Sequence, residues 1–242
     1  MNWLNNLFTN ADGVTPWWGI LLAIVIILAI GAAVTVAVIL IVNALRKKAG
    51  EGKELSRAQW NTRELIFGAL CIALAFALSY LKFFQMPQGG TITPASMLPI
   101  MMFAYIYGTP KGLIVGLAYG LLQLLQGAYI VHWAQLIMDY MLAFMAIALA
   151  GLFKKNILPG VIIAGLGRLL FAFLSGMIFF GEYAPPGQSA AIYSLVYNIT
   201  YIGPDTAICF IIALLPPVRK MIESLKRQAA QKKQQSADNQ PA

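Results

Sequence analysis

Seven apolar stretches constrain the fold of this chain more than any other feature, because their lengths suit a lipid bilayer. An α-helix rises about 1.5 Å per residue, so about 20 apolar residues cross the roughly 30 Å hydrocarbon core. Hydrophobic residues make up 60% of the 242 residues and charged residues 11%, which excludes a soluble domain. The sequence therefore predicts an all-α polytopic membrane protein. The stretches cover residues 17–44, 65–81, 95–107, 113–125, 134–153, 157–180 and 193–215.

Two of these stretches, residues 95–107 and 113–125, are short and meet at a turn-like sequence, residues 108–112 (GTPKG). We expect them to form a helical hairpin that neighbouring helices shelter. Small residues recur every four positions on two of the predicted helices, which in lipid permits close helix contact. The glycine face consists of Gly112, Gly116 and Gly120, and we expect it to pack against another helix of this chain. The alanine face consists of Ala69, Ala73 and Ala77, and it suits a helix of this chain or of a partner protein equally.

Basic residues set the predicted orientation. Of 17 Lys and Arg residues, fifteen lie on alternate connections or in the C-terminal tail, which places those parts in the cytoplasm and the N-terminus outside. The net charge of +8 therefore reflects topology and contact with lipid headgroups, not nucleic-acid binding. We predict an extra transmembrane helix at 1–48, a polar cytoplasmic linker at 49–63, a six-helix membrane domain at 64–218 and a basic cytoplasmic tail at 219–242.

Asp139 is the residue that bears most directly on function. It is a lone carboxylate inside an apolar stretch, where a charge costs about 2.5 to 3.5 kcal/mol on insertion scales and normally faces a bundle interior. Polar and aromatic residues at the extracellular ends of the neighbouring predicted helices lie at a similar depth in the membrane. Together they predict a pocket, open to the outside, for a flat heteroaromatic cation. Its candidate residues are Asp139, Tyr140, Tyr129, Gln135, Tyr193, Asn198, Phe180 and Trp133.

An aromatic belt at the membrane surface is the simpler interpretation of Trp133 and some of the tyrosines. It does not explain Asp139 or Asn198. A second polar pair, Arg168 and Asp205, lies at matching depth on two consecutive helices, and we expect a mainly structural ion pair between them.

Enzymatic activity is not predicted. The chain lacks the phosphate-binding loop of ATPases, the nucleophile elbow of serine hydrolases and the zinc-protease helix motif. One histidine and two cysteines inside apolar stretches do not build an ordinary zinc site. We therefore expect neither a metal nor another cofactor.

An ordered set of short motifs resembles the ThiT/YuaJ thiamine transporter family, the substrate-binding S-components of energy-coupling factor (ECF) transporters. The resemblance covers about residues 60–217. The motifs lie at residues 86–93 (MPQGGTIT), 96–100 (SMLPI), 135–140 (QLIMDY), 176–180 (GMIFF), 183–185 (YAP) and 193–198 (YSLVYN).

This resemblance implies a six-helix bundle that captures thiamine from outside. It implies three partner subunits, a transmembrane scaffold protein and two cytoplasmic ATPases, and a toppling motion that releases the vitamin inward. Asp139 takes the acidic position facing the thiazolium, Arg168 matches a basic pocket position, and Ala69 and Ala73 match the alanine motif that docks on the scaffold. Tyr140, Tyr129, Gln135, Tyr193, Asn198 and Phe180 match pocket positions.

The chain departs from the family pattern at two positions. Ala172 stands where members often carry a histidine, and Ala191 where many carry a tryptophan. The ligand is therefore thiamine or, alternatively, a precursor or another small heteroaromatic cation. Two further alternatives are a self-sufficient secondary transporter, with Asp205 and Arg168 relaying protons, and a membrane protein with a purely structural role.

Overall fold

The computed structural model describes the backbone of residues 60–238 and the side chains of residues 60–231. The predicted helix at 1–48 and most of the linker at 49–63 lie outside the described residues. The division of the chain into four parts remains a prediction.

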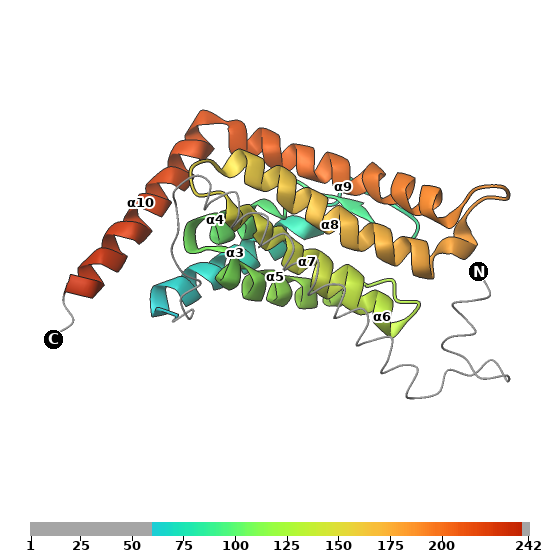
Figure 1. Cartoon of the computed structure of the whole chain (residues 1–242), viewed down its shortest axis with the longest axis horizontal. Helices are drawn as coiled ribbons and strands as arrows, with labels where there is room; N and C mark the ends of the chain where they lie inside the picture. Colours follow the sequence, from blue (N-terminus) through green and yellow to red (C-terminus); the bar gives the residue numbers. More distant parts are fainter. Residues whose placement is uncertain (1–59, 239–242) are drawn as a thin grey trace, which may run out of the picture. The chain divides into compact units, whose positions relative to one another are not determined.

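Helices dominate the described part of the chain, and four segments are long and apolar enough to cross a membrane (Figure 1). These are α3 (Thr62–Tyr80), the composite segment Trp133–Leu152, α8 (Ile157–Phe179) and α9 (Ala190–Leu214). Two shorter helices, α4 (Leu98–Tyr107) and α5 (Thr109–Gln123), form the predicted hairpin. The protein is thus an all-α polytopic membrane protein.

Polar side chains set the ends of the long helices. Asn61 and Glu64 form a capping box at α3, in which Asn61 accepts from the Arg63 amide at 3.3 Å and Glu64 accepts from the Asn61 amide at 3.0 Å. Asn156 caps α8 by accepting from the Leu158 amide at 3.2 Å, and Ser189 caps α9 by accepting from the Ile192 amide at 3.3 Å. The predicted turn at residues 108–112 is shorter than expected, because α5 already begins at Thr109 and only Gly108, at φ +93°, stands outside a helix.

The fifth apolar stretch changes its winding along its length. It begins as α6 (Trp133–Leu136), continues as a π-helical turn, η2 (Ile137–Leu142), and ends through α7 (Ala143–Met145) and the 3₁₀ segment η3 (Ala146–Leu152). The π-helical turn contains Asp139 and Tyr140. Such turns are rare and often mark functional sites.

The glycine face of α5 packs against this composite segment, as predicted. A Cβ atom at Gly120 would lie 1.8 Å from the Tyr140 carbonyl oxygen, and one at Gly116 would lie 2.6 Å from that of Phe144. Only hydrogen at these positions lets the two backbones approach so closely. The α5 glycines therefore position the π-helical turn that carries Asp139.

The remaining elements are a small hairpin, two short 3₁₀ turns and a final helix. Strands β1 (Phe84–Gln85) and β2 (Thr91–Ile92) pair antiparallel, with Phe84 opposite Ile92. The turns are η1 (Leu124–Gln126) and η4 (Gly181–Tyr183).

Helix α10 (Pro216–Asp238) leaves the end of α9 at an angle (Figure 1). Its helical backbone continues through the basic part of the chain as far as Asp238. Ile222 anchors the helix in the core, and the Tyr105 hydroxyl donates to Glu223 Oε1 at 2.7 Å.

Candidate functional site

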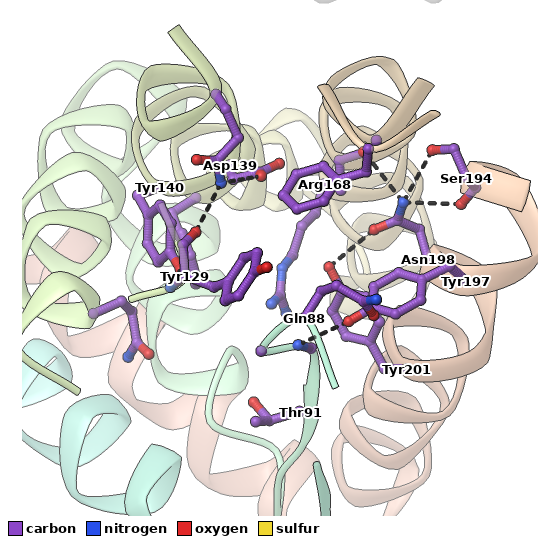
Figure 2. Close-up of a pocket in the computed structure, with 18 of the residues that line it drawn as sticks. Gln88, Thr91, Tyr129, Asp139, Tyr140, Arg168, Ser194, Tyr197, Asn198 and Tyr201 are labelled. Carbon is purple, nitrogen blue, oxygen red and sulfur yellow. Dashed lines mark hydrogen bonds between the residues drawn. The ribbon is translucent and has the colours of Figure 1, made fainter. Parts of the chain in front are cut away.

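A pocket opens between the β1–β2 hairpin (called the hairpin from here on), the π-helical turn, α8 and α9 (Figure 2). Its empty volume, counted together with the open solvent at its mouth, is about 750 Å³. Figure 2 shows Asp139 and Tyr140 on one side, Tyr197, Asn198 and Tyr201 on the other, and Gln88 and Thr91 of the hairpin below. The lining residues are Gln88, Gly89, Gly90, Thr91, Gln123, Tyr129, Gln135, Asp139, Tyr140, Phe144, Arg168, Ala172, Gly176, Phe180, Tyr193, Ser194, Tyr197, Asn198 and Tyr201.

Gln135 holds Asp139 in the pocket wall. Its side-chain nitrogen donates to Asp139 Oδ2 at 2.7 Å and to the Tyr129 carbonyl oxygen at 3.2 Å. Its own oxygen accepts from the Val131 amide at 3.4 Å. Because Gln135 is only 2% exposed, this amide fixes both the carboxylate and the loop that carries Tyr129.

Arg168 and Asp205 form the predicted ion pair. Arg168 Nη1 lies 3.2 Å from Asp205 Oδ2, and Asp205 is 1% exposed. Arg168 also lines the pocket, whereas Asp205 does not. The positive charge of the pocket therefore already has a partner. In contrast, no basic side chain of residues 60–231 forms an ion pair with Asp139.

Aromatic rings cover two sides of the pocket. The ring centroids of Tyr129 and Phe180 are 6.0 Å apart, and the Tyr129 and Tyr183 hydroxyls are 3.0 Å apart. On α9, Tyr193, Tyr197 and Tyr201 repeat every fourth residue, with centroid separations of 6.1 and 5.7 Å. Such rings offer faces to a planar cation.

The hairpin forms the pocket floor through backbone contact. The Gly90 amide donates to the Tyr197 hydroxyl at 3.3 Å, and a Cβ atom at Gly90 would lie 2.7 Å from the Tyr201 ring. Gly89, at φ +91°, allows the tight turn. Glycines therefore allow the hairpin backbone to lie directly against the α9 tyrosines.

Asn198 connects α8, α9 and the tyrosine face. Its side-chain nitrogen donates to the carbonyl oxygens of Ala172 at 3.2 Å and Ser194 at 2.9 Å. Its oxygen accepts from the Tyr201 hydroxyl at 3.0 Å. Asn198 thus orients the wall of the pocket and the Tyr201 hydroxyl.

Eight of the predicted pocket residues line one cavity, and the ninth, Trp133, does not. Trp133 starts α6 beside His132, with ring centroids 5.1 Å apart, and His132 stacks on Phe179 at the same separation. Burial lowers the pKa of His132, so its neutral Nδ1 accepts from the Ala134 amide and caps α6. The eight residues are Asp139, Tyr140, Tyr129, Gln135, Tyr193, Asn198, Phe180 and Arg168.

Sequence reasoning did not assign Tyr197, Tyr201 or the hairpin to the pocket. The spacing of four between Tyr193, Tyr197 and Tyr201 was a usable signal, since residues four apart share one face of a helix. No pattern in the sequence placed residues 88–91 against α9. Of the two departures, Ala172 lines the pocket and Ala191 does not.

Two known proteins are similar in sequence to this chain over most of their own lengths. Thiamine transporter ThiT of Bacillus subtilis (strain 168) is 34% identical over 170 residues, covering 62% of this chain and 88% of that protein. Thiamine transporter ThiT of Lacticaseibacillus paracasei is 27% identical over 154 residues, covering 54% of this chain and 74% of that protein.

A solved structure of ThiT from Listeria monocytogenes superposes with a TM-score of 0.61 at 28% identity, covering 69% of this chain and 99% of that chain. The family model described as "Thiamine transporter protein (Thia_YuaJ)" matches residues 65–224, about two thirds of the sequence. The chain therefore belongs to the thiamine transporter family.

Proposed function

We propose that this protein captures thiamine in the pocket beside Asp139 and takes it up across the cell membrane as the S-component of an ECF transporter. The observation that carries the proposal is a carboxylate in an aromatic pocket without an ion-pair partner among residues 60–231. A buried charge of this kind calls for a countercharge. The thiazolium ring of thiamine is a planar cation and supplies one.

The other predicted residues fit the remaining parts of the ligand. Tyr129, Tyr140 and Phe180 offer ring faces, and Tyr193 offers a hydroxyl toward the polar groups of the vitamin. Gln135 and Asn198 hold the wall in place through the hydrogen bonds described above. Arg168 contributes to the wall with its charge already paired.

Binding is tested by titrating purified protein with thiamine and following tryptophan fluorescence, with Trp133 two residues from Gln135 as a reporter. Saturable quenching supports the proposal, and no response to thiamine with a response to a precursor would assign the pocket to that precursor. An Ala172→His variant tests the departure from the family pattern. It should tighten thiamine binding if the pocket has lost a contact there.

Energy coupling is proposed to come from partner subunits, because the family is one of transporters, not enzymes, and this chain lacks an ATPase motif. We propose a transmembrane scaffold and two cytoplasmic ATPases, with the C-terminus in the cytoplasm and the N-terminus outside. The exposed alanine face of α3 supports a partner helix. Ala69 and Ala73 are exposed, and Leu70 and Leu74 beside them are 62% and 52% exposed.

Tryptophan at Ala69 and Ala73 should abolish ATP-dependent uptake in vesicles that contain the partner subunits, because a bulky ring prevents close helix approach. Thiamine binding by the purified variant should stay at the wild-type level, since no residue of α3 lines the pocket. Leu195→Trp, at an exposed position of α9, is the matched control and should leave uptake intact. Unchanged uptake by the double variant would exclude this face as the docking surface.

Uptake by this chain alone decides between the proposal and a secondary transporter. Purified protein in liposomes should bind thiamine but should not accumulate it when a pH gradient is applied. Accumulation driven by that gradient would establish proton coupling instead.

A further inference from the structure

The pocket contains two opposite charges that do not pair with each other. Asp139 enters from the π-helical turn and Arg168 from α8, and both line the same cavity (Figure 2). A free guanidinium in this cavity would be an internal countercharge for Asp139. It would then compete with any cationic ligand.

Asp205 keeps Arg168 from this role. Its Oδ2 lies 3.2 Å from Arg168 Nη1, which also donates to the Met97 sulfur at 2.9 Å. The guanidinium carbon lies 4.8 Å from the Phe144 ring centroid and 5.8 Å from that of Tyr201. The Arg168 side chain is therefore held by one anion, one sulfur and two rings.

The two oxygens of Asp205 have separate partners. Oδ2 faces Arg168, whereas Oδ1 accepts from the Thr93 amide at 3.1 Å and from the Thr93 hydroxyl at 2.8 Å. Thr93 directly follows β2, so Oδ1 anchors the strand that forms the pocket floor. One carboxylate thus serves both the position of the hairpin and the charge of the pocket.

We infer that Asp205 is a positioning residue that gives the pocket its selectivity for cations, because by holding Arg168 it leaves the charge of Asp139 for the ligand. Removing one partner of a buried ion pair leaves an uncompensated charge, which is strongly unfavourable. Without Asp205 the guanidinium would turn to Asp139, the carboxylate that lines the same cavity. This inference rests on the proposed function, in which Asp139 faces a thiazolium.

Asp205→Asn separates the two roles of this residue. The amide keeps an oxygen acceptor for Thr93 but presents an NH₂ group, in place of Oδ2, to Arg168. Two ligands are compared, thiamine and an uncharged analogue with a neutral aromatic ring in place of the thiazolium. Thiamine should bind to the variant about tenfold more weakly or worse, the loss of one charge-assisted contact, while the neutral analogue should keep its Kd.

A paired variant and a matched control identify the cause. In Arg168→Gln/Asp205→Asn the competing cation is gone. The ratio of the neutral analogue's Kd to the thiamine Kd should therefore return to its wild-type value. Thr93→Val keeps the ion pair and weakens only the anchor of the hairpin, so it should affect both ligands by the same factor. Thermal melting without ligand verifies that each variant is folded.

Equal Kd values of wild type and Asp205→Asn for each ligand would overturn the inference. It would also be overturned if Asp205→Asn weakened the binding of both ligands by the same factor and the added Arg168→Gln substitution did not restore it. If Asp205→Asn alone fails to fold, the paired variant decides, because it contains no unpaired charge at this position. If the paired variant then had a ratio of the neutral analogue's Kd to the thiamine Kd well below the wild-type value, the inference would be wrong. Failure of the proposed function itself has a different signature, wild-type protein that does not bind thiamine.

Discussion

Replacing Asp139 with asparagine is expected to weaken thiamine binding by about 10- to 150-fold. A hydrogen bond to a charged group contributes about 1.5 to 3 kcal/mol, and each 1.4 kcal/mol corresponds to about a tenfold change in Kd. The substitution preserves shape, and the amide can still accept from Gln135, which now donates to Asp139 at 2.7 Å. Titration calorimetry or fluorescence titration of the purified variant measures the change.

Glu182→Gln is the matched control for this prediction. Glu182 is an exposed acid in the 3₁₀ turn η4, which follows Phe180, and it does not line the pocket. The same loss of one negative charge should there leave thiamine binding within about twofold of wild type, as the effect of an exposed charge is small. If Asp139→Asn bound thiamine as tightly as wild type, Asp139 would not be the countercharge and the proposed binding mode would be wrong.

Replacing Gly120 with alanine is expected to be the most damaging small substitution in the described part of the chain. The new Cβ atom would lie 1.8 Å from the Tyr140 carbonyl oxygen, and this neighbour is backbone that cannot rotate away. Overpacking of this kind typically costs about 1–3 kcal/mol, and this contact lies at or beyond the upper end of that range. The π-helical turn must move, so both the melting temperature and the thiamine affinity should fall.

Gly203→Ala provides the contrast within the same protein. Gly203 is also a helical glycine, but a Cβ atom there would meet nothing within 4 Å. Its melting temperature should therefore stay close to that of wild type, with a change in stability below about 1 kcal/mol. If Gly120→Ala melted together with Gly203→Ala, α5 and the π-helical turn would not approach as closely as the structure describes.

The positions of the transmembrane helices followed from hydropathy, and within the described residues their ends agree to within a few positions. The stretches 157–180 and 193–215 correspond to α8 (Ile157–Phe179) and α9 (Ala190–Leu214). Such agreement is physical in origin, since unpaired backbone groups are so unfavourable in lipid that an apolar stretch of this length must be helical. The change of winding at residues 137–142 had no comparable signal. The element that packs against this segment, α5, lies elsewhere in the sequence.

The pocket was predictable where a residue violated the rule for its surroundings. Asp139 and Asn198 stood out because polar groups inside apolar stretches need partners, and both line the cavity. Tyr197 and Tyr201 did not stand out, because a tyrosine in a membrane helix is ordinary. The hairpin floor at residues 88–91 was missed for another reason. A two-residue strand has no periodicity to detect.

The sequence by itself determined the class of protein, the course of the helices and the presence of a carboxylate that requires a countercharge, because these depend on the transfer of single segments into lipid. Depth along the helices also predicted the ion pair between Arg168 and Asp205, which the structure contains. Only the tertiary structure decided that Arg168 lines the cavity together with Asp139, and that Asp139 has no ion-pair partner there among residues 60–231. Pairing depends on distances of a few ångströms between different helices, and packing contacts such as those of Gly120 set those distances.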